Sequence, residues 1–410
     1  TGSFRYGAEA RGDFANSWNS TISFFVLNGV EIMKKIKNVL YIVMIVVLFT
    51  IVAIGCDAGK TGESTTPATP EATTPTETTT DKIVVEITTP GGNETSEGET
   101  TTSEEPTTEQ PSKDNMVKSY LTGQWVDKEI GTKRPIAIML NNIMVAVPQS
   151  GIENAAIVYE TPVEGGITRL IGIFEDYSAL DKIGSVRSAR LYHGYIALEF
   201  DAIFAHYGCA IYANDLLKNH VDNIDGNAGE GTVAYYRVND RKAPHNAYTS
   251  AEHIAAGIKY KNYRTEYSDT YNGHFKFAED GETILLAPAD KATRVALGYV
   301  NNSPWFEYNE KDKLYYRYQF KTAQIDQETG NQLAYNNIIV QFVDYYDYGD
   351  GYYYIYNQGS GTGKFITNGR YIDITWKKDK EFGITRYYNE HGEEITLNQG
   401  KTWVSIVFDT

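Results

Sequence analysis

Three arginines, Arg169, Arg187 and Arg190, stand among glycines and apolar residues in a chain whose formal net charge is -16. A guanidinium is a flat fork of N–H donors that matches carboxylate and phosphate groups. Arg187 and Arg190 also stand where the sequence predicts the start of a helix, whose free backbone N–H groups favour anions. These residue types therefore indicate a site for an anionic group.

A second group of polar residues follows further along the chain. His206 ends an apolar run, and one loop region then brings together Arg237, Arg241, His245 and Asn246. These side chains can fork, donate hydrogen bonds or titrate. We expect them to gather at strand ends in the same part of the fold.

The balance of basic residues changes along the chain. Residues 163–246 contain five arginines and three lysines, whereas residues 247–410 contain five arginines and twelve lysines. Lysine is typical of solvated faces, and arginine is favoured in buried or anion-binding positions. The candidate ligand-binding residues are Arg169, Arg187, Ser188, Arg190, Arg237, Arg241 and Asn246.

Two other interpretations of these residues stay open. Arginine–carboxylate networks hold strands in register without any ligand. Alternatively, Glu164 could work as an acid or base with His206 or His245, since proton transfer needs only hydrogen-bond reach or one water. These three residues are the catalytic candidates. No motif marks a nucleophile, so the sequence favours a protein that is not an enzyme.

No cofactor or metal site is indicated. The seven histidines lack zinc-motif spacing. Gly359–Phe365 (GSGTGKF) lacks the first glycine and the Ser/Thr of a phosphate loop and is interpreted as a glycine hairpin. Cys209 is interpreted as a small buried hydrophobe. Asp344–Tyr356 (DYYDYGDGYYYIY) could stack on sugars or pack as an aromatic hairpin.

Strands and helices alternate in the part that must position the candidates. Strands are expected at 134–142, 155–163, 167–176 and 201–208, and helices at 189–200, 212–220 and 249–260. The second and third strands are apolar on both faces and so central.

Local patterns refine this picture. Alternation along Ile167–Glu175 places Arg169 on the face of Ile171 and Ile173. A buried guanidinium needs a partner, and Glu160 and Glu164 are close in sequence.

Three further expectations concern a turn and two helix starts. Gly165-Gly166 allows a turn or bulge. Ser185 or Ser188 is expected to cap the helix that Arg187 and Arg190 begin. Thr249 and Glu252 have the spacing of a capping box at the next helix.

After about residue 262 the sequence consists of short aromatic, β-rich runs divided by turns. The predicted fold class is α+β. A mixed α/β module at 116–262 is followed by a mainly antiparallel β module at 263–410.

Residues 33–56 resemble a signal that directs a protein to the membrane. A basic stretch (Met33–Lys37), an apolar stretch (Val39–Ile54) and Gly55 form a secretory signal peptide, 33–56. The letters VAIGC resemble a bacterial lipobox, in which Cys56 receives a diacylglyceryl group after the signal is cut. A single transmembrane anchor is the alternative, but the apolar stretch is short for a span. We expect an acylated protein (diacylglyceryl and palmitate) on the outer face of the cytoplasmic membrane.

Two segments flank this signal. Residues 1–32 are interpreted as an upstream, non-native extension. Residues 57–115 are rich in Thr, Glu and Pro, with thirteen acidic residues against three lysines. Such a segment cannot bury enough apolar area to fold. It is predicted to be a disordered tether of roughly 40 Å root-mean-square span.

Six motifs in order, EGGITR, GSVRSAR, HYG, RKAPHN, GSGTGKFITNGRYIDITWKK and GEEITLNQGKTWVSIV, resemble the YerB-like family of bacterial lipoproteins. The similarity runs from about Arg134 to Phe408. It implies a lipid-anchored, extracytoplasmic protein in two parts. It supplies no activity, because the family is a domain of unknown function. It draws attention to Glu164, Arg169, Arg187, Arg190, His206, Arg241, His245 and Asn246.

The leading hypothesis is thus an extracytoplasmic lipoprotein that binds an anionic group through its arginines. The group could belong to a wall glycan, a teichoic-type polymer, a peptide carboxylate or an envelope protein. A cell-wall-directed hydrolase and a protein–protein scaffold are the alternatives. Nucleic acid is excluded as a partner, since its recognition needs a basic face.

Overall fold

The computed structural model describes residues 85–88 and 113–409. The chain divides into two units, 1–78 and 79–410, and every described residue belongs to the second. The predicted upstream extension, the signal peptide with Cys56 and most of the predicted tether lie outside the described residues. No helix within 85–88 and 113–409 has the length and apolar character needed to cross a membrane.

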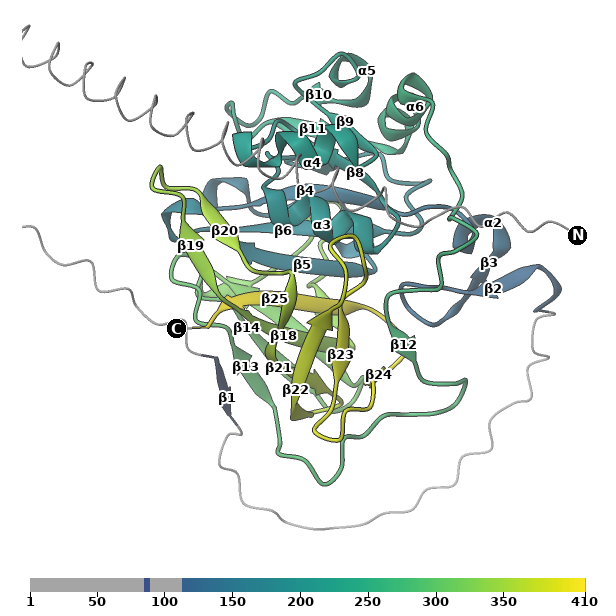
Figure 1. Cartoon of the computed structure of the whole chain (residues 1–410), viewed down its shortest axis with the longest axis vertical. Coiled ribbons are helices and arrows are strands. Elements are labelled where there is room, and N and C mark those ends of the chain that lie inside the picture. The colour runs from purple at the N-terminus through teal and green to yellow at the C-terminus, as the bar shows by residue number, and fades with distance from the viewer. Residues whose placement is uncertain (1–84, 89–112, 410) are drawn as a thin grey trace, which may run out of the picture. The chain divides into compact units, whose positions relative to one another are not determined.

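One ten-stranded sheet organises the structure (Figure 1). Its strands lie in the order β23 (Arg386–Tyr388), β22 (Arg370–Lys378), β21 (Gly359–Thr367), β18 (Asn337–Val343), β25 (Thr402–Phe408), β5 (Ile157–Pro162), β6 (Thr168–Phe174), β4 (Ile136–Asn142), β8 (Ile203–His206) and β9 (Asn223–Asp225). β25 pairs in parallel with both β18 and β5. The strands of the two predicted modules therefore share one continuous sheet.

The expected strands at 134–142, 155–163, 167–176 and 201–208 are present as β4, β5, β6 and β8. β5 and β6 are buried along their whole length, as predicted for runs that are apolar on both faces, and β4 is equally buried. Alternation divides their side chains between two cores. Ile171 and Ile173 lie in one core, and Leu170 and Phe174 lie in the other.

The described helices are few and short beside the sheet. They are α2 (Lys128–Gly131), α3 (Leu191–Glu199), α4 (Asn214–Asn219), α5 (Gly231–Ala234) and α6 (Ala251–Lys261), with 3-10 turns at Lys113–Asn115, Met144–Ala146, Ile152–Asn154, Glu164–Gly166 and Ile211–Ala213. α3 and α4 cover the face that carries Ile171 and Ile173. Gly194 allows this packing, because a Cβ there would lie 2.8 Å from Leu216. The fold is mostly sheet with few helices.

Smaller sheets complete the fold. The six-stranded sheet joins β1 (Glu86–Thr88), β13 (Arg294–Ala296), β14 (Trp305–Asn309), β15 (Leu314–Gln319) and β16 (Thr322–Ala323), with β17 (Ala334–Tyr335) beside β15. The others are β10 (Tyr236–Arg237), β11 (Ala247–Thr249) and β7 (Ile183–Gly184); β12 (Lys276–Phe277) and β24 (Thr396–Leu397); β19 (Tyr345–Asp347) and β20 (Tyr353–Ile355); and β2 (Met116–Lys118) and β3 (Trp125–Asp127).

Two segments differ from their expected structure. β1 falls inside the predicted tether, yet it pairs with β13, so this short piece lies against the body. Gly359–Phe365 is not a hairpin turn. It lies within β21, which pairs with β18 and β22. Its glycines admit close neighbours, since a Cβ at Gly363 would lie 2.4 Å from the Val340 carbonyl oxygen.

The cap of α6 is also displaced by one residue from the predicted capping box. Ser250 is the N-cap, and its Oγ accepts a hydrogen bond from the backbone N–H of His253. Thr249 instead donates its hydroxyl to the carbonyl of Ala234. Thr and Ser are adjacent here and both are good caps, so the pattern alone did not separate them.

Ser250→Ala is expected to lower the free energy of unfolding by about 1 kcal/mol, because one N–H at the helix start loses its acceptor. Glu252→Ala is the control and should change it by less than about 0.5 kcal/mol, as for an exposed residue outside the cap. Urea unfolding of both variants measures this. Equal losses would favour the Thr249–Glu252 capping box.

Candidate functional site

The candidate residues gather at one edge of the large sheet. β4 and β5 both run antiparallel to β6, and β8 runs parallel to β4. The carboxyl ends of β4, β5 and β8 therefore meet where β6 begins. In sheets with parallel strands, ligands bind outside such carboxyl ends.

Three polar residues lie side by side on this edge. Arg169 on β6 is paired in register with Asn141 on β4 and with Thr161 on β5. Because paired residues share a face of the sheet, all three lie on the side covered by α3. The predicted face of Arg169 is thus confirmed.

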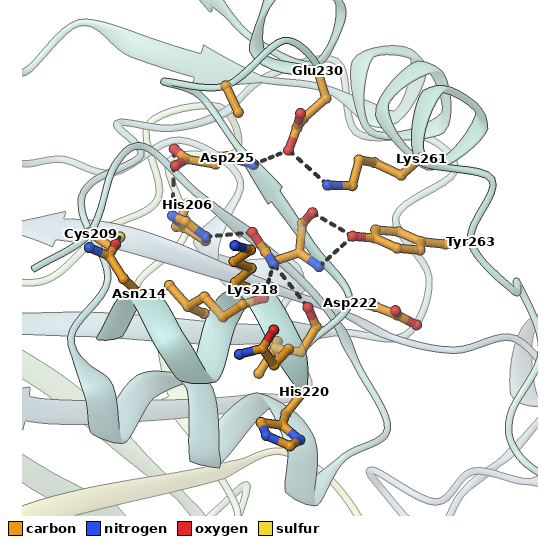
Figure 2. A pocket seen from close by; sticks show the side chains of 15 residues that line it. His206, Cys209, Asn214, Lys218, His220, Asp222, Asp225, Glu230, Lys261 and Tyr263 are labelled. Carbon is orange, nitrogen blue, oxygen red and sulfur yellow. Dashed lines mark hydrogen bonds and ion pairs between the residues drawn. The ribbon is translucent and has the colours of Figure 1, made fainter. Parts of the chain in front are cut away.

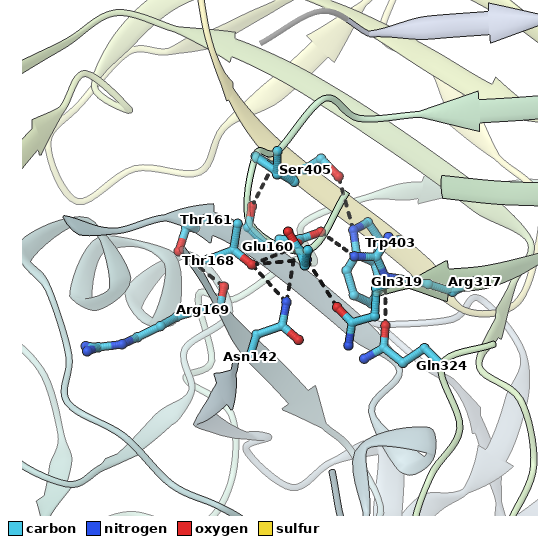
Figure 3. Close-up of polar contacts among 12 residues, drawn as sticks. Asn142, Glu160, Thr161, Thr168, Arg169, Arg317, Gln319, Gln324, Trp403 and Ser405 are labelled. Carbon is cyan, nitrogen blue, oxygen red and sulfur yellow. Dashed lines mark hydrogen bonds and ion pairs between the residues drawn. The ribbon is translucent and has the colours of Figure 1, made fainter. Parts of the chain in front are cut away.

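Arg169 is only 6% exposed; of the two carboxylates expected near it, Glu164 acts on it as a nearby charge, whereas the prediction of Glu160 is wrong. Its Nη1 donates to the backbone carbonyl of Ser188. Glu160 lies on the opposite face of the sheet, where Arg317 Nη2 binds its carboxylate at 2.6 Å. Figure 3 shows the Arg169 side chain extending away from Glu160. Alternation explains the difference, since neighbouring residues of β5 point to opposite faces.

Arg187 and Arg190 are held by an extended segment that crosses the sheet edge. Arg187 donates its N–H to Met139 at 3.0 Å and accepts one from Tyr207 at 3.0 Å. α3 begins only at Leu191, with Arg190 as its N-cap. Ser185 and Ser188 therefore cap no helix, contrary to expectation.

Glu164 forms a bidentate pair with Arg190. Its two carboxylate oxygens accept from Nε and Nη2 of Arg190 at 2.6 and 2.5 Å. The predicted turn at Gly165-Gly166 is present, with φ of 75° and 68°, and open space surrounds both glycines. The guanidinium of Arg190 also lies 5.0 Å from the ring centre of Tyr352.

We call Arg169, Arg187 and Arg190 the arginine cluster. Burial, together with the charges of Arg190 and Arg187, lowers the pKa of Arg169 to about 9. Burial and Arg190 also lower the pKa of Arg187. Within the described part of the chain, Nε of Arg187 is buried without a hydrogen-bond partner. Glu164 therefore leaves part of the positive charge of the cluster unbalanced.

His193 on α3 contacts the backbone of the arginine cluster. It was not among the candidate residues predicted from the sequence. The backbone N–H of Arg190 donates to its Nδ1 at 2.8 Å, so Nε2 carries the proton and donates to Thr161 at 2.7 Å. Burial, with Arg169 and Arg190 nearby, holds the pKa of His193 well below its ordinary 6.5. The ring is therefore neutral and adds no further charge.

His245 and Arg241 approach the same edge from the loop before β11. Nδ1 of His245 lies 2.9 Å from the side-chain amide of Asn141. Burial and the charges of Arg187 and Arg241 lower the pKa of His245. Arg241 itself is tied down, because it donates to the carbonyl of Pro148 at 2.8 Å and to Gln327 at 3.0 Å.

Other candidates have local partners. Arg237 donates to the side chain of Asn246 at 2.7 Å and lies over the ring of Tyr207. Asn246 in turn donates to the carbonyl of Val238 at 3.1 Å, which closes the loop between β10 and β11. Ser188 contributes its backbone carbonyl to Arg169. The ligand-binding role of these residues stays a prediction.

A separate pocket of about 450 Å³ opens beside β8 and β9 (Figure 2). Figure 2 shows Glu230 between Asp225 and Lys261, and its carboxylate accepts from Lys261 at 3.2 Å. Cys209 lines this pocket and is half-buried rather than buried; its thiol donates to Asn214 at 3.1 Å. Burial raises the pKa of that thiol, so it stays protonated. The arginine cluster does not line this pocket.

The three catalytic candidates each bind other groups. Both oxygens of Glu164 are held by Arg190, and the ring nitrogens of His206 face Gly208 O at 2.9 Å and Asn223 Oδ1 at 3.2 Å. Over 85–88 and 113–409, no hydrogen bond joins Glu164 to His206 or His245. The same residues contain no group of three His, Cys, Asp or Glu side chains that could hold a metal ion.

On the opposite face of the sheet, a buried polar network surrounds Glu160 (Figure 3). Glu160 and Arg317 are both 0% exposed. Glu160 also accepts from Thr168 and Asn302, each at 2.8 Å, and Arg317 lies 4.0 Å from the ring centre of Trp403. The network links the large sheet to β15 of the six-stranded sheet.

Comparisons with known proteins agree with this architecture. The family models "Protein of unknown function (DUF3048) N-terminal domain" and "C-terminal domain" match residues 121–264 and 295–404. "Putative lipoprotein YerB" of Bacillus subtilis is 31% identical over 299 residues, covering 72% of this chain and 87% of the relative. The crystal structure of that YerB protein matches with a TM-score of 0.63 and 29% identity, covering 71% of this chain and 96% of that one. The chain therefore belongs to the two-domain DUF3048 family that includes YerB.

Proposed function

We propose that this protein is a lipid-anchored protein on the outer face of the bacterial cytoplasmic membrane that binds an anionic envelope ligand through the arginine cluster. The lipobox-like sequence at Cys56 supports the anchor. So does the lipoprotein name of its Bacillus relative.

The observation that carries the binding proposal is the unbalanced charge of the cluster. Burial and the nearby charges of Arg190 and Arg187 lower the pKa of Arg169 to about 9, and within the described residues Glu164 is the one carboxylate hydrogen-bonded to the cluster. A bound anion would relieve this repulsion and accept the N–H of Arg187 that has no partner among the described residues.

A thermal-shift titration with phosphate and sulfate at constant ionic strength tests the proposal. An anion at about 100 times its dissociation constant should add about 2.7 kcal/mol of stability, seen as a raised Tm. Arg187→Ala should abolish this shift. Without anion, the variant should stay about as stable as the native protein, because removal of one charge relieves repulsion.

Arg294→Ala is the matched control, since Arg294 stacks on Trp305 in the six-stranded sheet. It should leave the anion shift unchanged. If no anion raises the Tm and Arg187→Ala alone lowers it strongly, the cluster is a structural network and the proposed function is wrong.

A further inference from the structure

Beside the arginine cluster, the β19–β20 hairpin and the turn Ile211–Ala213 present a row of tyrosines. We call it the tyrosine strip: Tyr212, Tyr346, Tyr348, Tyr352, Tyr354 and Tyr356. Tyr346 and Tyr356 are 41% and 43% exposed. Aromatic side chains gathered on an accessible surface are a common sign of a binding face.

Alternation along the hairpin produces the strip. Tyr345 and Tyr353 point inward, where Tyr345 stacks on Phe408 with ring centres 3.7 Å apart. Tyr346 lies directly opposite Tyr354 in the register of β19 and β20, and both point outward. The inner tyrosines thus hold the hairpin on the core.

The outer rings form a continuous series. Ring centres lie 5.1 Å apart between Tyr346 and Tyr354, and 4.9 Å between Tyr354 and Tyr356. Tyr348 stacks on Tyr212 at 3.6 Å. Asp350, in the turn of the hairpin, accepts a hydrogen bond from the Tyr212 hydroxyl at 2.7 Å, which fixes this end of the strip.

The series ends at the arginine cluster. Tyr212 contacts Tyr352 with ring centres 6.0 Å apart, and Tyr352 lies under the guanidinium of Arg190. A series of side-chain contacts therefore runs from exposed phenol rings to a group of positive charges. A ligand that covers both must combine flat apolar faces and hydroxyl groups with an acidic group.

We propose that the tyrosine strip binds the neutral sugars of a flat glycan strand whose acidic group enters the arginine cluster. This inference rests on the proposed function and names its ligand class. Sugar faces pack on aromatic rings, and their hydroxyls can bond to the phenols. The exposed acids Asp344, Asp347 and Asp350 accept sugar hydroxyls but repel an anionic membrane surface, so a glycan is favoured over lipid headgroups.

Three probes separate the two contributions: cellopentaose, which is a neutral β-linked glycan; cellopentaonate, its derivative oxidised to a terminal carboxylate; and gluconate, the acid alone. Isothermal titration of the whole protein is expected to give the tightest binding for cellopentaonate. The double variant Tyr346→Ala/Tyr354→Ala should weaken the binding of cellopentaonate about tenfold, which corresponds to about 1.4 kcal/mol. It should leave the binding of gluconate unchanged. Tyr260→Ala removes another exposed tyrosine, on α6 (58% exposed). This control variant should bind cellopentaonate and gluconate as the native protein does.

Other outcomes assign failure to one proposal or the other. If the double variant binds cellopentaonate as the native protein does, or if cellopentaonate binds no tighter than gluconate, the strip inference is wrong and the anion site stands. If Arg187→Ala binds gluconate and cellopentaonate as tightly as the native protein does, the proposed function is wrong as well. A circular dichroism spectrum and Tm equal to those of the native protein verify that the double variant is folded.

Discussion

Replacing Arg317 by methionine is expected to lower the free energy of unfolding by about 3 to 5 kcal/mol. The substitution leaves the Glu160 carboxylate, which is 0% exposed, without its positive partner. The remaining side-chain donors, Thr168, Asn302 and Asn142, are neutral and cannot compensate a buried charge. Urea unfolding measures the loss through a lower midpoint.

The double variant Glu160→Gln/Arg317→Met should recover most of that loss, because removing both charges also removes the desolvation cost of the pair. The network is already imperfect. In the part of the chain described, Arg317 Nη1, Gln319 Nε2 and Asn302 Oδ1 are buried without partners. If the double variant is no more stable than Arg317→Met, the pair is held by packing on Trp403 rather than by its charges.

Stability is expected to fall as the pH drops below about 6.5. His193 is 0% exposed and its pKa is held well below 6.5 by burial and by Arg169 and Arg190. The folded state therefore keeps this ring neutral while the unfolded chain takes up a proton. Each histidine that stays neutral in the folded state should lower the free energy of unfolding by about 1.4 kcal/mol at one pH unit below 6.5.

A second decline should follow at lower pH. Burial opposes ionisation of Glu199, but Lys378 and His274 outweigh it and hold its pKa at about 2. A carboxylate with a depressed pKa stabilises the fold above its ordinary 4.5, and this contribution is lost between 4.5 and about 2.

Urea midpoints measured at pH 7.5, 6.5 and 5.5 check the first decline. His193→Gln removes the titrating ring, so this variant should be less stable at pH 7.5 but should lose less stability on acidification. An unchanged pH dependence in His193→Gln would contradict the role assigned to this residue.

The sequence predicted β5 and β6 as central strands because both are runs that are apolar on both faces, and alternation placed Arg169 on the correct face. It also brought together Arg169, Arg187, Arg190 and Glu164, which do lie at one edge of the sheet.

Pairs of residues far apart in the chain could not be predicted from the sequence. Arg317 is 157 residues from Glu160, and no local pattern relates the two. A carboxylate near Arg169 in sequence was therefore assigned to it, although a one-residue difference along a strand reverses the face. His193 gave no signal either, because a lone histidine in an apolar helix looks like an ordinary core residue. Arg237, Arg241, His245 and Asn246 were predicted to lie in one loop region, and within it Arg237 and Asn246 bind each other and close the loop between β10 and β11.

The central place of β25 has a consequence for how the protein is made. The nine other strands of the large sheet precede β25 in the chain, and none of them bridges β18 and β5. A nascent chain released from the ribosome only as far as residue 401 therefore carries two half-sheets, each with an open edge that templates association with other chains. The two half-sheets can therefore join only after β25 has been made, and a chain truncated before residue 402 is expected to associate through its open edges.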